Sequence, residues 1–401
     1  MVSPERRPAI LLVDDEPRVL AGLRRALYAL GTDWQVSTAN SGSEALALMA
    51  DQPFDVVVSD MRMPNMTGAE LLDRVRHLHP EVIRFILTGQ TSQAALIAAA
   101  GPTHQVLAKP CEPRLLRQTL ERALRLRTVL QDARVRAEVT GVANLPAVPR
   151  LYAEIKRALA RPDTSIEEVG RLIADDPATS AKLLQVVNSP FFGMTHRVSS
   201  PARAAVLLGV EAVQALVLGL GAFEGLAAAE DAGLPVDTFF QRAVLTARLA
   251  RLVARDLQLS ADEEEEAYLG GLMHDVGWLV LGVSQADSLG RFLAARGDPA
   301  RPPEEAFFGA SHRAFGAYLM ALWGIPDAVV DAVAHHHDLA LAGLPDAGVL
   351  RAVLVADSVL SAQHPLPTDP VVALEIPDNL RGLMARALGH TEAVMKEAAL
   401  A

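Results

Sequence analysis

The chain has 401 residues, half of them apolar but only 4% aromatic, and a formal net charge of −11. This length exceeds what one hydrophobic core usually serves, so two or three domains are expected. The acidic balance excludes a general attraction to nucleic acid or anionic lipid, and the single cysteine excludes an internal disulfide and a cysteine-rich zinc site. We find no signal-peptide pattern and no apolar run long enough to span a bilayer, and therefore expect a cytoplasmic protein without membrane insertion.

Four apolar runs near the start of the chain each end in polar residues. The predicted strands are Ala9–Val13, Phe54–Ser59, Phe85–Leu87 and Gln105–Ala108. The residues that follow them are, in order, Asp14 with Asp15, Asp60, Thr88 and Lys109. Because the ligand crevice of an open parallel α/β sheet lies at the carboxyl ends of its strands, these side chains are expected to converge. Three converging carboxylates need a cation, and an all-oxygen site suits Mg²⁺.

This set of side chains also suits phosphoryl transfer, which requires mainly positioning and charge neutralisation. Asp60 would attack a phosphoryl donor, while Asp14 and Asp15 hold the metal. Lys109 would neutralise the phosphoryl oxygens, and the Thr88 hydroxyl would bond one of them. The sequence therefore predicts an acyl phosphate on Asp60.

Residues 8–127 resemble the receiver domain of two-component response regulators. The resemblance is carried by Asp14-Asp15, Asp60 within Asp60-Met-Arg-Met-Pro64, Gly68, Thr88-Gly89 and Lys109-Pro110. It implies a flavodoxin-like fold with a doubly wound parallel sheet. It also implies that a partner histidine kinase supplies the phosphoryl group and that the receiver itself catalyses the transfer to its aspartate. It also implies the backbone carbonyl of Arg62 as a further magnesium ligand. Where many receivers carry a Tyr or Phe that rotates during switching, this chain has Val106.

The last receiver helix is predicted to continue as a signalling helix over residues 115–139. Leu116, Leu120 and Leu130 belong to a stripe with three- and four-residue spacing. The stripe leaves two arrangements open, a coiled coil that makes a homodimer and a helix folded back on its own receiver. The arginines between 114 and 136 favour an amphipathic helix over a nucleic-acid site. Thr140–Pro149, with one Gly and two Pro, ends the helix and begins a second domain.

The second domain is predicted to be all-helical. The expected helices are Leu151–Ala160, Ser165–Ala174, Ala178–Asn188, Pro201–Leu208, Val210–Gly221, Thr238–Leu257 and Asp262–Leu281. Ser165 with Glu168, and Ser260 with Glu263, have capping-box spacing and predict two helix starts. The predicted fold class is therefore a multidomain chain, in which an α/β receiver precedes an all-α, HD-like domain.

Residues 140–370 resemble an HDOD domain, a relative of the HD-superfamily phosphohydrolases, and 371–401 are expected to form a helical extension. The matching segments are Leu145–Pro149, Ile173–Ala178, Leu183–Gly193 and Ala204–Gly209. The resemblance implies an output module that acts by protein–protein contact rather than by catalysis. No motif in the sequence identifies the downstream protein to which this module would bind.

A set of histidines and aspartates follows the order of metal ligands in catalytic HD and HD-GYP phosphodiesterases. The set is His274, Asp275, His312, His336, His337 and Asp357, with His335 as a spare. Arg242 stands where the first ligand histidine is expected, and Asp338–Pro345 replaces the Gly-Tyr-Pro signature. The arginine would repel a second dication by a few kcal/mol, at an effective dielectric of about 20. Two alternatives remain for the set, a vestigial hydrogen-bonded cluster and a site for a single transition metal.

We therefore interpret the chain as a bacterial response regulator that is phosphorylated on Asp60 and signals through a noncatalytic HDOD domain. A first alternative is a receiver-gated, metal-dependent phosphodiesterase. A second is a nucleotide-sensing module, because Arg242 suits phosphate binding better than a di-metal centre.

Overall fold

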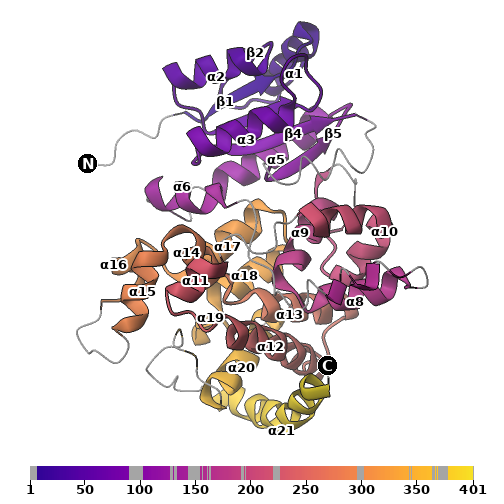
Figure 1. Cartoon of the computed structure of the whole chain (residues 1–401), viewed down its shortest axis with the longest axis vertical. Helices are drawn as coiled ribbons and strands as arrows, with labels where there is room; N and C mark the ends of the chain where they lie inside the picture. Colours follow the sequence, from indigo (N-terminus) through magenta and orange to yellow (C-terminus); the bar gives the residue numbers. More distant parts are fainter. Residues whose placement is uncertain are drawn as a thin grey trace. The chain divides into compact units, whose positions relative to one another are not determined.

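The chain divides into two compact units in the computed structural model (Figure 1). Unit 1 comprises residues 1–143, 185–196 and 322–324, and unit 2 comprises 144–184, 197–321 and 325–401. The structure describes residues 7–89, 103–126, 130, 133–142, 154–155, 157–159, 161, 164–190, 194, 196–219, 226–295, 302–342, 344, 346–363, 366, 368 and 378–400.

Unit 1 contains a five-stranded sheet with the order β2-β1-β3-β4-β5. The strands are β1 Ala9–Val13, β2 Gln35–Ala39, β3 Val56–Asp60, β4 Ile83–Thr88 and β5 Gln105–Ala108, and every neighbouring pair is parallel. The four predicted strands are confirmed. β2 was not predicted, because its Gln, Ser and Thr residues break the apolar run.

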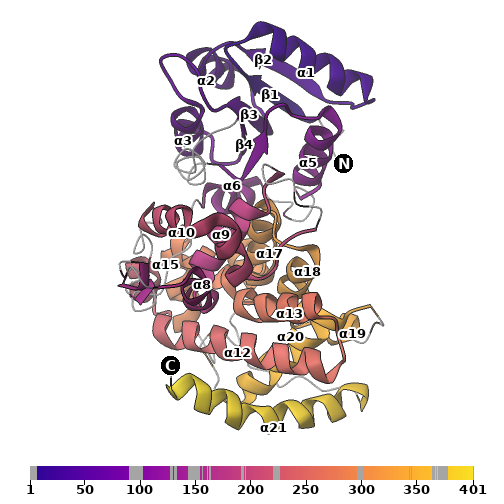
Figure 2. The same cartoon turned by 90° about the vertical axis from the view of Figure 1, so that its right-hand side faces the viewer.

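Helices cover both faces of this sheet (Figure 2). They are α1 Pro17–Ala29, α2 Gly42–Asp51, α3 Gly68–Leu78 and α5 Pro113–Leu126. α1 packs against α5, and α2 packs against α3. With both faces covered, β1, β3 and β4 are buried along their whole length, which explains their mostly apolar sequences. The predicted α/β fold of this region is confirmed.

The single signalling helix predicted over 115–139 is wrong in one respect. α5 ends at Leu126, residue 130 lies in a bend, and a separate helix α6 covers Ala133–Gly141. Leu116, Leu120 and Leu130 are buried within the chain. These three leucines are thus used for packing inside the chain, and of the two arrangements that the sequence left open the coiled-coil homodimer gains no support. Most of the predicted break at 140–149, namely 143–149, lies outside the described residues.

Unit 2 is built from helices, as predicted. They are α8 Ile166–Ala174, α9 Pro177–Val187, α10 Pro201–Gly219, α11 Leu226–Asp231, α12 Val236–Asp256, α13 Ala261–Met273, α14 Val276–Ser284, α15 Ala286–Ala294, α16 Glu304–Phe308, α17 His312–Leu322, α18 Asp327–His335, α19 Leu339–Ala342, α20 Gly348–Gln363 and α21 Asp378–Leu400. The predicted helix 151–160 is described only in part, and 154–155 and 157–159 are helical.

Two details of the predicted helices changed. Pro201–Leu208 and Val210–Gly221 join into α10, with a kink at Gly209, whose φ of 78° suits glycine. The helix predicted over Asp262–Leu281 is wrong as one element, because it breaks at His274 and Asp275 into α13 and α14. Both predicted N-caps are confirmed: the Ser165 and Ser260 side chains accept hydrogen bonds from the backbone N–H groups of Glu168 and Glu263.

The core of unit 2 lies around α12, which packs against α13, α20 and α21 (Figure 2). The apolar side chains of these helices form one buried cluster. A Cβ on Gly271 would lie 2.8 Å from the Cα of Ala247, so α13 approaches α12 closely at that point. None of the helices within the described ranges combines the length and apolar character that a membrane crossing requires.

Candidate functional site

The strand ends of unit 1 bring Lys109 between two aspartates. The Lys109 ammonium lies 2.6 Å from Asp14 Oδ2 and also forms an ion pair with Asp60 Oδ1. Asp14, Asp60 and Thr88 are buried, whereas Asp15 is exposed. Burial alone would lower the pKa of Lys109, but hydrogen bonds and charge attraction from Asp14 and Asp60 raise it above its ordinary value. The predicted carboxylates and ammonium therefore lie together.

The second oxygen of each aspartate is held by the backbone. The amide of Glu16 donates to Asp14 Oδ1 at 2.9 Å, and the amide of Arg62 donates to Asp60 Oδ2 at 2.8 Å. The other oxygen of each carboxylate is directed toward the positive charge of Lys109. Two buried carboxylate oxygens held around one cation, with exposed Asp15 beside them, are a donor set that fits Mg²⁺.

Gly68 allows α3 to begin against the end of β3. A Cβ at this position would lie 2.0 Å from the backbone oxygen of Asp60, so any larger residue must displace the strand end. The Gly68 amide donates to the backbone oxygen of Met61 at 2.9 Å. The glycine thus fixes the backbone that presents the Asp60 carboxylate.

A buried polar network lies at the opposite end of β4 from Thr88. The Arg84 guanidinium donates to the backbone oxygen of Thr140 at 2.8 Å, and the His104 ring lies 3.2 Å from the same guanidinium. His104 Nε2 is also 3.0 Å from the Thr140 oxygen. Burial lowers the pKa of Arg84. These contacts tie α6 to the sheet through β4 and β5, and the sequence did not predict them, because the three residues are far apart in the chain.

Unit 2 brings four of the predicted metal ligands together. Asp275, His312, His336 and His337 each offer a ligand atom, and these atoms all lie within 4.8 Å of one another. We call these four residues the histidine cluster. His312 Nε2 lies 3.3 Å and His336 Nε2 lies 3.5 Å from Asp275 Oδ1. This geometry suits one cation among imidazole and carboxylate donors.

The outer ring nitrogens of three histidines point at oxygen acceptors. His312 Nδ1 is 2.7 Å from Glu304 Oε2, His336 Nδ1 is 2.9 Å from the Val333 oxygen, and His274 Nδ1 is 2.8 Å from the Gly271 oxygen. A proton on each Nδ1 satisfies these acceptors and turns the Nε2 lone pair inward. Metal-binding histidines are oriented by this kind of outer contact.

Asp275 and Asp357 favour the protonated form of His274, which lies beside the histidine cluster. Burial alone would lower the pKa of His274, but Asp275 and Asp357 outweigh it and raise the pKa to about 10. The pKa of Asp275 is held well below its ordinary value, because the histidines counteract the effect of burial. Burial and the neighbouring histidines lower the pKa of His336 and His337, so these two rings are held neutral, with lone pairs available to a cation.

Arg242 makes a fixed ion pair with the last predicted ligand. Its Nη2 atom donates to Asp357 Oδ1 at 2.6 Å, and the two side chains are only 4% and 3% exposed. The Ser361 hydroxyl donates to the same Asp357 oxygen at 3.2 Å and accepts from Arg242. The guanidinium thus neutralises Asp357 from the position at which a first ligand histidine was expected.

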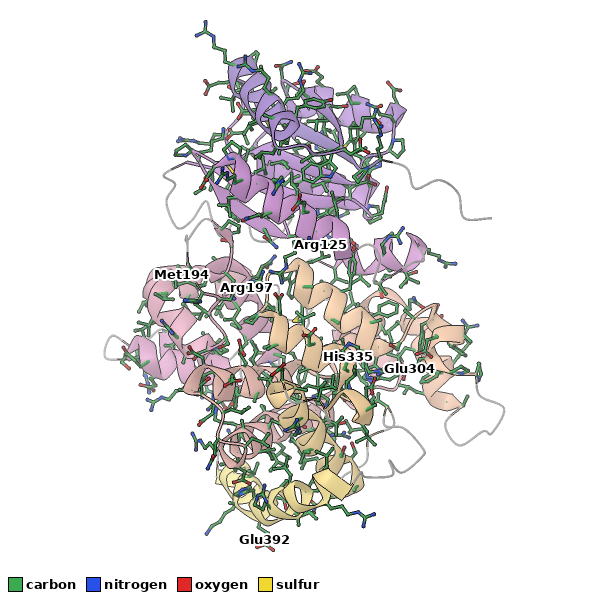
Figure 3. All side chains as sticks on the ribbon, turned by 180° about the vertical axis from the view of Figure 1, so that it is seen from behind. Arg125, Met194, Arg197, Glu304, His335 and Glu392 are labelled. Carbon is green, nitrogen blue, oxygen red and sulfur yellow. The ribbon has the colours of Figure 1, made fainter. Side chains whose placement is uncertain are left out.

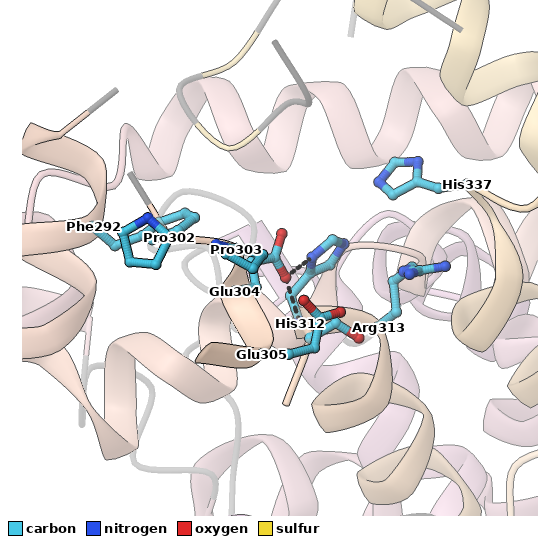
Figure 4. Close-up of a pocket in the computed structure, with 9 residues that line it drawn as sticks. Phe292, Pro302, Pro303, Glu304, Glu305, His312, Arg313 and His337 are labelled. Atoms are coloured by element: carbon cyan, nitrogen blue, oxygen red, sulfur yellow. Dashed lines mark hydrogen bonds and ion pairs between the residues drawn. The ribbon is translucent and has the colours of Figure 1, made fainter. Parts of the chain in front are cut away.

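A pocket of about 360 Å³ leads to the histidine cluster (Figure 4). Glu304, His312, Arg313 and His337 are among its lining residues. Arg242 is not, so the interpretation of Arg242 as a phosphate-binding residue in an open pocket is not supported. Trp278 stacks on the His312 ring at 4.7 Å between centroids and holds it in place.

The structure separates the predicted ligands into two groups. His336 and His337 join the cluster, and His335, labelled with Glu304 in Figure 3, does not. His274 lies 3.2 Å from Asp275 and 3.4 Å from Asp357, between the cluster and the arginine pair. Glu304 was missed by sequence reasoning, because two glutamates after two prolines have no distinctive spacing.

Comparison with known proteins identifies a receiver domain in the first part of the chain and an HDOD domain in the second. The model of the response regulator receiver domain matches residues 10–121, and the model of the HDOD domain matches residues 145–339. The hydrogenase transcriptional regulatory protein HoxA of Cupriavidus necator is 36% identical over 122 residues, which are 30% of this chain and 25% of HoxA. The transcriptional regulatory protein GlrR of Escherichia coli is 33% identical over 162 residues, 40% of this chain and 35% of GlrR.

The matched part of this chain thus covers well under two thirds of the length of these curated relatives. Among solved structures, a fragment of the MmoQ response regulator of Methylococcus capsulatus has a TM-score of 0.50 and 24% identity, covering 61% of this chain and 91% of the fragment. At that identity the likeness concerns the fold alone. With the receiver fold, the strand-end site and the two domain matches together, the chain belongs to the response regulators that join a receiver domain to an HDOD domain.

Proposed function

We propose that a sensor histidine kinase phosphorylates this protein on Asp60 in the cytoplasm, and that the HDOD domain passes the signal to a partner protein without catalysis. The observation that carries the proposal is the shared ion pair of Lys109 with Asp14 and Asp60. An ammonium already placed between two carboxylates neutralises charge where a phosphoryl group would arrive.

In the proposed reaction, a carboxylate oxygen of Asp60 attacks the phosphorus of a phosphohistidine. The new O–P bond forms as the P–N bond breaks, and the electron pair remains on the imidazole nitrogen. Asp14, Asp15, Asp60 and the Arg62 carbonyl would hold Mg²⁺, which supplies charge neutralisation for the phosphoryl oxygens. Lys109 and the Thr88 hydroxyl then bind the transferred group.

β4 offers a route from the phosphoryl group to α6. Thr88 ends this strand and follows Leu87, the register partner of Asp60, and Arg84 on the same strand binds the backbone oxygen of Thr140 in α6. A shift of Thr88 toward the phosphoryl group would displace β4 and change the contact with α6. This route needs no aromatic residue at Val106.

Labelling with acetyl phosphate and Mg²⁺ tests the acceptor. Intact mass should show one added phosphoryl group in the parent protein and none in Asp60→Asn. Asp51→Asn, at the exposed end of α2, is the matched control and should be labelled like the parent. Undiminished labelling of Asp60→Asn would refute the proposal.

For unit 2 we propose one metal ion at most, held by the histidine cluster. Arg242 occupies the position of a missing ligand and neutralises Asp357, which supports a site for a single ion. Elemental analysis after purification without chelators should give no more than one transition-metal ion per chain. His336→Ala should weaken binding at least about tenfold, whereas His335→Ala, outside the cluster, should not. Two ions per chain would contradict this account.

Phosphodiesterase activity is the alternative function, because the pocket beside His312 could admit a substrate to the histidine cluster. HD-type hydrolysis uses two metals to generate and aim a hydroxide, and Arg242 opposes the second. We therefore expect no turnover of cyclic dinucleotides with Mn²⁺ or Fe²⁺. Turnover that disappears in the double variant His274→Ala, Asp275→Ala would establish the enzyme instead.

A further inference from the structure

A second cavity in unit 2 is lined by four arginines. It encloses about 450 Å³ between α8, α10, α12, α13 and α21, a volume typical of small-molecule sites. We call it the arginine pocket, defined by Arg171, Arg248, Arg251 and Arg255. Neither the histidine cluster nor its access pocket shares these residues.

The local sequence places these arginines together. Arg248, Arg251 and Arg255 are spaced by three and four residues on α12, so they lie on one face of the helix. Arg171 comes from α8. A Cβ on Gly170 would lie 2.9 Å from the Cα of Ala202, and this close approach brings the first turn of α10 to the pocket beside Arg171.

The pocket has more positive than negative charge, although the chain as a whole is acidic. Four arginines line the pocket with two carboxylates, those of Asp175 and Glu265, and Arg255 also donates to Glu264 at 2.8 Å, so the arginines exceed the carboxylates by one. Arg248 donates to Asp175 at 2.9 Å and Arg251 donates to Glu265 at 2.9 Å. Each guanidinium carries five N–H donors, so these bonds leave most of the donors for a ligand.

Arg251 is the most constrained of the four. Its guanidinium carbon lies 4.1 Å from the centroid of the Tyr268 ring, and the Tyr268 hydroxyl donates to Asp175 at 2.5 Å. Its Nε atom is buried and meets no hydrogen-bond acceptor within the described part of the chain. Because this Nε is closed off from the pocket, a ligand would meet the terminal nitrogens of the rigid guanidinium.

We propose that the arginine pocket binds a small phosphorylated ligand of the size of a nucleoside monophosphate. Guanidinium groups bind phosphate oxygens in a bidentate manner, and the first turn of a helix also favours an anion. Ala174, Leu252 and Val394 supply apolar wall for the organic part of the ligand. The proposal is independent of phosphorylation at Asp60, because it concerns different residues and a noncovalent ligand.

Isothermal titration of the full chain tests the proposal with inorganic phosphate, adenosine 5′-monophosphate, glucose 6-phosphate and adenosine. At least one phosphate ester should bind, and adenosine should not. The preferred ester identifies the organic part. If none of the phosphorylated probes binds, or if adenosine binds as well as its monophosphate, the proposal is overturned.

Variants locate the binding. Arg171→Gln and Arg255→Gln should each weaken it at least about fivefold, and since both side chains are exposed the fold should persist. Arg291→Gln, at an exposed position of α15, is the control and should bind like the parent. Glu265→Gln releases Arg251 from its competing carboxylate and should strengthen binding. Equal affinity in the parent and in both pocket variants would overturn the proposal.

Discussion

Each unit contains a cation paired with carboxylates, Lys109 in unit 1 and Arg242 in unit 2, and their surroundings differ. Lys109 is 27% exposed and shares its charge between Asp14 and Asp60, whereas Arg242 is 4% exposed and is bonded to Asp357 beside Ser361. A lysine ammonium is a point charge on a flexible chain, whereas an arginine guanidinium is a rigid fork. The first pair can rearrange when a phosphoryl group arrives, and the second is a permanent part of the core.

The largest expected difference between the two pairs is the loss of unfolding free energy when the cation of each is removed. Arg242→Met removes the guanidinium that donates to buried Asp357, which should cost about 3–5 kcal/mol of unfolding free energy. Lys109→Met, measured with Mg²⁺ present, should change the unfolding free energy by less than about 1 kcal/mol, because the metal still neutralises the aspartates. Denaturant unfolding measures both, and equal losses would refute the contrast.

The backbone that presents Asp60 should be nearly as sensitive as the buried pair. Gly68→Ala forces a Cβ against the Asp60 oxygen and should cost about 1–3 kcal/mol while slowing labelling by acetyl phosphate. Gly22→Ala on α1 is the control, since a Cβ there meets no atom within 4 Å of the described chain. The control should be neutral or stabilising by up to about 1 kcal/mol. A Gly68→Ala protein as stable and as reactive as the parent would contradict the close approach.

Ser361 should contribute the smallest effect. Ser361→Ala removes the hydroxyl that bonds both members of the arginine pair and should cost about 0.5–1.5 kcal/mol. Ser358, a neighbouring serine on α20, gives the control variant Ser358→Ala, whose hydroxyl has no hydrogen-bond partner in the described residues. A larger loss in the control than in Ser361→Ala would argue against a built hydrogen-bond network around Asp357.

The strand-end site could be predicted because its signals are local. Asp14, Asp60, Thr88 and Lys109 each follow a short apolar run, and the parallel topology then brings them together. β2 was not predicted, because its three middle residues include only one buried side chain, that of Val36, and so form no apolar run.

The remaining features depend on contacts between distant parts of the chain. Leu130, between α5 and α6, is buried, and the pairing of Arg242 with Asp357 joins α12 to α20. Neither contact leaves a mark on the local sequence. The arginine pocket is partly visible in the sequence, because Arg248, Arg251 and Arg255 are spaced by three and four residues. Arg171, from α8, joins them only in the folded chain.

Hydrogen–deuterium exchange with and without beryllofluoride and Mg²⁺ tests the central claim most directly. The phosphoryl mimic should change the exchange of the peptides that contain Lys109 and residues 133–141 of α6, and should leave the segments around Arg242 and Asp357 unchanged. Asp60→Asn should remove the response. No change at Lys109 and α6, or the same change in Asp60→Asn, would contradict the switch at Asp60 and Lys109.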